Sequence, residues 1–133
     1  MGLDTSHDCW HGAYSAFMRF RTAIAKVVGV DLLKMQGYGE SPRGSGIPWD
    51  SLPPDPLWTL LYHSDCEGSI LVADCIPIAE RLEAIAPALA DLDATDEYGH
   101  GHVARNGGYA ESARQFARGL RAAAEAGENV EFH

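Results

Sequence analysis

The chain has 133 residues, and 46% of them are hydrophobic, which predicts one compact domain, residues 1–133, with a modest core. Nineteen acidic residues against ten basic residues give a formal net charge of −9, which argues against nucleic acid and membrane surfaces as partners because both are anionic. No apolar run is long enough to cross a bilayer as a helix, and the first residues do not read as a signal peptide, so we expect a cytoplasmic protein.

The opening segment concentrates potential metal ligands. His7, Cys9 and His11 stand at alternate positions, close to Asp4. Alternate side chains share one face of an extended segment, so these ligands could converge on zinc or another soft ion. Alternatively, the His and Cys side chains pack beside Trp10 as structural groups. The odd cysteine count of three favours reduced thiols or metal ligation over disulfides.

An amphipathic helix is predicted over residues 13–28. Its apolar side chains follow alternating steps of four and three residues, and Gly29 ends the pattern. Arg19 and Arg21 fall off the apolar stripe. They are either solvated or turned toward the acidic loop described below or toward a ligand.

A long irregular loop is predicted over about residues 35–55, because glycines and prolines interleave there. A loop of this length is typical of a disordered segment or a functional lid. Tyr38, Arg43 and Trp49 could contact a ligand from this loop. The alternative is that the aromatic side chains dock the loop on the body of the protein.

A short apolar helix at about residues 56–62 is expected to lead into an acidic turn. Counted from His63, potential ligands fall at positions 1, 3, 5 and 12, with Gly68 at position 6; they are His63, Asp65, Glu67 and Asp74. This spacing resembles the calcium loop of an EF-hand, in which a glycine allows the sharp turn. The chain departs from that pattern because His63 replaces an Asp and Asp74 replaces the bidentate Glu.

The resemblance implies a divalent cation held by those four side chains. A mixed set of oxygen and nitrogen ligands suits calcium poorly and tolerates magnesium, manganese or zinc. In the competing interpretation, Asp74 caps the following helix and the loop is a rigid structural clasp. We expect Asp65→Ala to lower the thermal midpoint only in the presence of metal if a metal binds.

The remaining elements complete a mainly α fold of about four helices, including the EF-hand-like helix-loop-helix. A helix follows Asp74 with Cys75 on its apolar stripe, a second irregular loop covers about residues 93–108 and contains Arg105, and a final helix covers about residues 109–126. The tail at residues 129–133 alternates briefly, which predicts a short two-stranded ribbon with the N-terminal segment.

Two motifs carry a wider resemblance. The Gly-Leu-Asp and His-Asp-Cys-Trp patterns between Gly2 and Trp10, and the His-Ser-Asp-Cys-acid-Gly loop at His63 to Gly68, are similar to those of a family of small uncharacterised bacteriophage and prophage proteins. The resemblance implies a viral accessory protein acting in the host cytoplasm, with a counter-defence role by association. It supplies no activity.

Three classes of function follow. The first is a non-enzymatic accessory protein with the metal-binding or structural loop. The second is a protein that binds and sequesters a nucleotide-like signal. The third is a metal-dependent hydrolase, although the common phosphate-loop, dinucleotide, nucleophile-elbow and zinc-protease motifs are missing. The sequence leaves the oligomeric state open. For the second class, a base could stack on an aromatic side chain and a phosphate could meet an arginine; the candidates are Trp10, Tyr14, Tyr38 and Trp49 with Arg19, Arg43 and Arg105.

Overall fold

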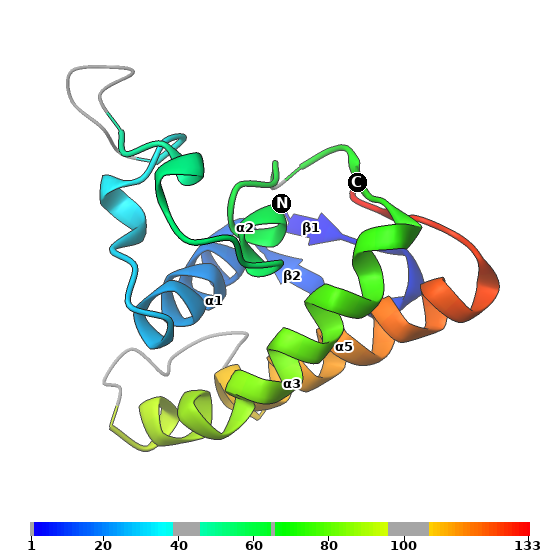
Figure 1. Ribbon diagram of the computed structural model, residues 1–133. Coiled ribbons are helices and arrows are strands. Elements are labelled where there is room, and N and C mark those ends of the chain that lie inside the picture. Colours follow the sequence, from blue (N-terminus) through cyan, green and yellow to red (C-terminus); the bar gives the residue numbers. More distant parts are fainter. Residues whose placement is uncertain (1, 39–45, 65, 96–106) are drawn as a thin grey trace.

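The computed structural model describes residues 2–38, 46–64, 66–95 and 107–133. Within these ranges the protein is mainly helical, as predicted (Figure 1). Its α-helices are α1 (Tyr14–Val27), α2 (Leu57–Leu61), α3 (Val72–Thr95) and α5 (Gly108–Ala126). The 3₁₀ turn η1 (Ser6–Asp8) precedes α1, and η2 (Leu32–Lys34) and η3 (Trp49–Ser51) lie between α1 and α2.

The two long helices, α3 and α5, lie side by side and form the base of the molecule (Figure 1). Helix α1 contributes Phe17 and Phe20 to the core, and their rings lie 6.4 and 6.2 Å from the ring of Phe116 on α5. Trp10 stacks on Phe20 at 5.2 Å. These side chains are all buried, so the apolar stripe predicted for α1 does face the core.

A carboxylate near the end of α3 caps the start of α5. The Asp93 carboxylate accepts hydrogen bonds from the backbone N–H groups of Tyr109, at 2.7 Å, and Ala110, at 3.1 Å. The first N–H groups of a helix have no partner within the helix, and the positive end of the helix dipole favours an acid there. A side chain on Gly108 would collide with this carboxylate, since its Cβ would lie 2.7 Å from the Asp93 oxygens.

Four short strands tie the chain ends together. Strand β1 (Gly2–Asp4) pairs with β2 (His11–Ala13), and β3 (Ser69–Ile70) pairs with β4 (Val130–Glu131), both antiparallel. The tail after β4 joins the two ribbons, because Thr5 bridges to Phe132 and the backbones of Asp4 and His133 exchange two hydrogen bonds of 2.9 Å. The predicted contact between tail and N-terminal segment is confirmed, and β3 extends it.

The boundaries of α3 differ from the sequence prediction. The helix begins at Val72, so Asp74 lies within the first turn and is not the cap. The backbone N–H of Val72 donates instead to Oδ1 of Asn129, at 2.8 Å. The helix also continues through Pro77 and Pro87, both of which are exposed. A proline on a solvent-facing side of a helix leaves a carbonyl that water can satisfy, which makes the interruption tolerable.

The described parts of the first predicted loop are anchored on the protein body. Met35 bridges to Ile47, and Trp49 is buried with its indole N–H donating to Gln36 O at 3.0 Å. Trp49 also lies 5.4 Å from the ring of Trp58. Trp49 therefore docks the loop on the body of the protein, which was the alternative to ligand contact. The rest of this loop, and residues 96–106 of the second, lie outside the described residues.

Gly119 lets the N-terminal turn lie directly on α5. A Cβ at this position would lie 2.7 Å from His7 O and closer still to Cys9 Sγ. Gly→Ala within a helix normally stabilises a protein by about 1 kcal/mol. We expect Gly119→Ala to destabilise this protein by about 1–3 kcal/mol instead, because overpacking must displace the turn. Urea denaturation measures the sign, and an unchanged or increased stability would show that the close approach is absent.

Candidate functional site

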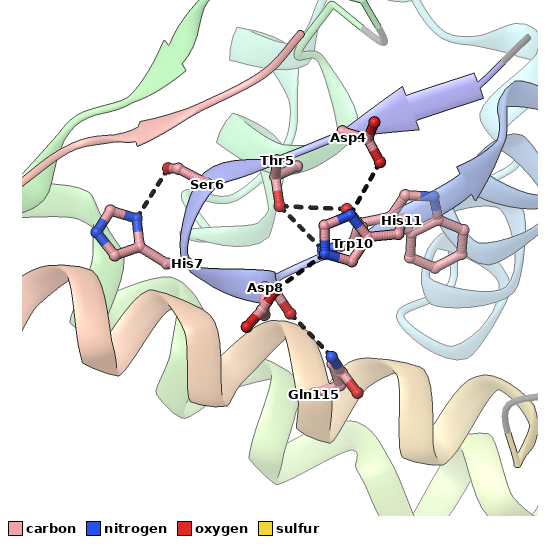
Figure 2. Close-up of polar contacts among 8 residues, drawn as sticks. All are labelled: Asp4, Thr5, Ser6, His7, Asp8, Trp10, His11 and Gln115. Carbon is pink, nitrogen blue, oxygen red and sulfur yellow. Dashed lines mark hydrogen bonds and ion pairs between the residues drawn. The ribbon is translucent and has the colours of Figure 1, made fainter.

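The N-terminal turn between β1 and β2 has a strained backbone. His7 and Asp8 both adopt left-handed conformations, with φ of 61° and 57°, and residues other than glycine rarely do so. The turn is held by buried Thr5, whose Oγ1 accepts the N–H of Trp10 at 2.9 Å, and by Gln115 of α5, whose amide donates to Asp8 O at 2.9 Å (Figure 2). The expectation of an extended segment here is therefore wrong.

The four candidate ligands of this segment do not share one face. His11 lies between two carboxylates, with Nδ1 2.9 Å from Asp4 Oδ1 and Nε2 3.0 Å from Asp8 Oδ1. His7 points to the other side of the turn (Figure 2). Cys9 is buried against α5, and burial raises the pKa of its thiol to about 12. Its Sγ occupies the space that a Cβ on Gly119 would take, so the thiol packs against α5.

His7 belongs to a separate chain of hydrogen-bonding groups. Its Nδ1 lies 2.8 Å from Ser6 Oγ, and its Nε2 lies 3.0 Å from Glu128 Oε1. Ser6 Oγ also accepts the backbone N–H of Glu131 at 2.9 Å. The three side chains Ser6, His7 and Glu128 thus form a continuous hydroxyl, imidazole and carboxylate series at the junction of the turn with the tail.

In the EF-hand-like loop, the side chain of His63 closes the turn by hydrogen bonding. Its Nδ1 lies 2.7 Å from Ser64 O and its Nε2 3.0 Å from Ser69 O, so both nitrogens face carbonyl acceptors. Gly68 has φ of 89°, as the glycine of such a turn requires. The imidazole also packs on Phe132, with the ring centroids 4.1 Å apart.

The other candidate ligands of this loop are spread out. Glu67 is exposed, Asp74 is half-buried in the first turn of α3, and Asp65 lies outside the described residues. Across the ranges that the structure describes, no three His, Cys, Asp or Glu side chains are grouped so that they could hold a metal ion. Cys75 is a buried core residue, as its place on the apolar stripe predicted.

A pocket of about 380 Å³ lies where α1, the turn after η2 and the end of α2 meet. Arg21 of α1 is buried in its wall, with 4% of its surface exposed, and its Nη1 donates to His63 O at 2.6 Å. The guanidinium lies over the rings of Phe17 and Tyr38, at 4.6 and 5.4 Å from their centroids. The lining residues are Met18, Arg21, Gln36, Gly37, Tyr38, Tyr62, His63 and Ser64.

The predicted ligand-contacting residues separate into three groups. Tyr38 lines the pocket and its hydroxyl donates to Leu61 O, whereas Trp10 and Trp49 are buried in the core and at the loop anchor. Tyr14 and Arg19 are half-buried and do not line this pocket. Arg43 and Arg105 lie outside the described residues. The arginine that turns toward the acidic loop is Arg21, one of the two that the helix pattern left open.

Comparison of the chain with protein-family models, curated proteins and solved structures finds no match. Within the described ranges, the helices are too short or too polar to cross a membrane.

The pair of carboxylates around His11 leads to a pH prediction. Hydrogen bonds to Asp8 and then to Asp4 raise the pKa of His11 above its ordinary value of 6.5. The stability that this network adds is fully present below pH 6.5, where the imidazole is charged in both folded and unfolded chains, and is lost as the pH rises through the raised pKa. In an NMR titration, Asp8→Asn and Asp4→Asn should each lower the pKa of His11. Coincident titration curves for the protein and both variants would contradict the contacts.

Proposed function

We propose that the protein binds a small anionic molecule with a planar group in the pocket lined by Arg21. The observation that supports this proposal is that the guanidinium of Arg21 is buried in the wall of the pocket. A volume of about 380 Å³ lies in the range of small-molecule sites and suits one mononucleotide rather than a larger signal. A nucleotide-like ligand is the class that this chemistry supports best.

The orientation of the guanidinium supports this choice. Two aromatic rings and the His63 carbonyl hold it in place, so little side-chain freedom remains to be lost when a ligand binds. The planar fork of an arginine matches the oxygens of phosphate and carboxylate. Because the net charge of −9 opposes long-range attraction of anions, binding must depend on this local group.

The aromatic side chains of the pocket supply the complementary surface. Tyr38 and Tyr62 both line it, and Tyr62 leaves 48% of its surface exposed. An exposed ring at the wall of a pocket can stack on a planar heterocycle. We further propose that this binding sequesters a host signal, which is the role that the resemblance of the turn and loop motifs to small phage proteins suggests.

Binding can be measured with adenosine and guanosine monophosphates, their cyclic 3′,5′ forms, and inorganic phosphate. A ligand that binds only the folded state at about one hundred times its dissociation constant stabilises it by about 2.7 kcal/mol. We therefore expect a rise of several degrees in the thermal midpoint with a purine nucleotide and a smaller rise with phosphate. Calorimetric titration then gives the dissociation constant.

Variants locate the site. Tyr62→Ala removes an exposed pocket wall and should weaken nucleotide binding about tenfold while the protein stays folded, given that base stacking contributes about 1–3 kcal/mol. Arg21→Lys keeps the charge but loses the fork, and should weaken binding of both nucleotide and phosphate. Arg114→Ala, on the exposed surface of α5, is the matched control for general attraction of anions. Equal effects of Arg114→Ala and Arg21→Lys, or no binding by the unaltered protein, would reject the proposal.

For the loop at His63, the structural clasp is the role that we propose alongside ligand binding. The contacts of the two imidazole nitrogens with Ser64 O and Ser69 O support it, since a neutral imidazole donates to one of these carbonyls, and so does the packing of the ring on Phe132. His63→Gln should lower the unfolding free energy by about 1 kcal/mol, because the turn loses a hydrogen bond to a partly buried backbone carbonyl and the packing of the imidazole on Phe132. The loss should be equal with EDTA and with added magnesium, manganese, zinc or calcium. A loss confined to the metal-loaded protein would favour the metal-binding interpretation.

A further inference from the structure

Ser6, His7 and Glu128 form a constellation that neither ligand binding nor the clasp uses. We propose that Ser6 is a nucleophile, activated by His7, that takes the acyl group from small neutral carboxylic esters. The geometry carries this inference: the Ser6 hydroxyl is 2.8 Å from His7 Nδ1, and His7 Nε2 is 3.0 Å from Glu128 Oε1. A nucleophile within reach of a base, with the base oriented by a third group, is the general arrangement of covalent catalysis.

The contacts define which atom carries which hydrogen. Glu128 accepts from Nε2, so Nε2 carries the hydrogen of the neutral imidazole and Nδ1 presents its lone pair to the Ser6 hydroxyl. Ser6 Oγ meanwhile accepts the N–H of Glu131 at 2.9 Å, which leaves its second lone pair for attack on a carbon. In chymotrypsin-like triads Nε2 of the histidine faces the serine and Nδ1 faces the carboxylate. Here Nδ1 faces Ser6 and Nε2 faces Glu128, but the roles of the three groups are the same.

The turn is built so that this arrangement is held in place. His7 and Asp8 remain left-handed, which costs about 1–2 kcal/mol for each residue. The contacts that sustain this strain are the buried Thr5 clasp, the Gln115 hydrogen bond and the close approach permitted by Gly119. Strained backbone held by its surroundings is frequent at reactive sites.

The chemical step balances with these groups alone. Ser6 Oγ forms a bond to the ester carbonyl carbon while its proton passes to His7 Nδ1, and the carbonyl oxygen takes the displaced electron pair. When the carbonyl re-forms, the bond to the leaving oxygen breaks and that oxygen takes the proton from Nδ1. Water, activated in the same way, then hydrolyses the acyl-Ser6 ester and restores the hydroxyl.

The surrounding charges define the substrate class. Asp4, Asp8, Glu128 and Glu131 are the acids near this turn, and they disfavour phosphate esters and carboxylate-bearing substrates by repulsion. A neutral ester of a short acid avoids this cost. We expect water to hydrolyse the acyl-Ser6 ester more slowly than an activated ester forms it, because the serine alkoxide is a poorer leaving group than a phenolate, so the covalent adduct should accumulate.

The experiment exposes the full chain to p-nitrophenyl acetate and follows both p-nitrophenol release and the mass of the protein. We expect one acetyl group on Ser6 by peptide mapping, in the Cys66→Ser background that removes the exposed thiol as a competing acceptor. Ser6→Ala should abolish the adduct, and Ser6→Thr, which keeps the hydroxyl, should retain part of it. Ser15→Ala, at an exposed serine of α1, is the matched control and should change nothing.

Two further variants separate chemistry from structure. His7→Asn suits the left-handed backbone and should lower the acylation rate about a hundredfold, the usual contribution of a general base. Glu128 is a positioning residue, so Glu128→Gln should slow acylation at an unchanged thermal midpoint, and Glu128→Asp should recover part of the rate. Acetyl groups found only on lysines or the N-terminus, or a Ser6 adduct that forms equally in His7→Asn, would overturn the proposal.

Discussion

The packing of Phe132 is the interaction on which both candidate sites depend. Its backbone N–H donates to Gly68 O at 2.9 Å, and its backbone forms a β-bridge with Thr5. The centroid of its ring lies 4.1 Å from that of His63 and 6.1 Å from that of Phe17. One buried residue near the chain end thereby connects the N-terminal turn, the EF-hand-like loop and α1. These contacts join parts of the chain that are far apart in the sequence. Closing so long a loop costs conformational entropy, and burial of the Phe132 ring offsets that cost.

Burial of Arg21 puts a positively charged group inside a very acidic protein. A guanidinium is expensive to remove from water, and here the rings of Phe17 and Tyr38 and the carbonyl of His63 offset part of that cost. Because His63 supplies this carbonyl and also closes its own turn, the clasp and the pocket share a residue. The loop at His63 therefore shapes the pocket even in a protein without a bound metal.

Local patterns in the sequence were sufficient for α1, α5 and the tail, but not for the start of α3. Apolar residues spaced three and four positions apart located α1 and α5. Apolar and polar residues that alternate in the tail indicated the pairing between Asp4 and His133. Pairing of the tail with β3 was not predicted, because nothing in a two-residue strand identifies a partner elsewhere in the chain. The left-handed turn at His7 was missed for a similar reason: no glycine marks it, and contacts with α5 impose it.

The candidate sites depended on tertiary contacts to a greater degree. Arg21 and Arg19 are indistinguishable by their place off the apolar stripe, and only the fold shows that Arg21 meets His63. The spacing of His7, Cys9 and His11 predicted a shared metal site, yet each side chain interacts with a different part of the protein. The partner of His7 is Glu128, more than a hundred positions away, which no local pattern could supply.

The contact between the N-terminal turn and Gly119 also provides a criterion for recognising distant relatives. A chain that folds its opening residues in this way needs a position without a side chain on the facing helix, since Cys9 Sγ and His7 O occupy the space of a Cβ. Paired occurrence of a Ser-His-Asp-Cys turn and a glycine in the middle of the last helix would therefore identify a shared architecture where overall similarity is too low to detect.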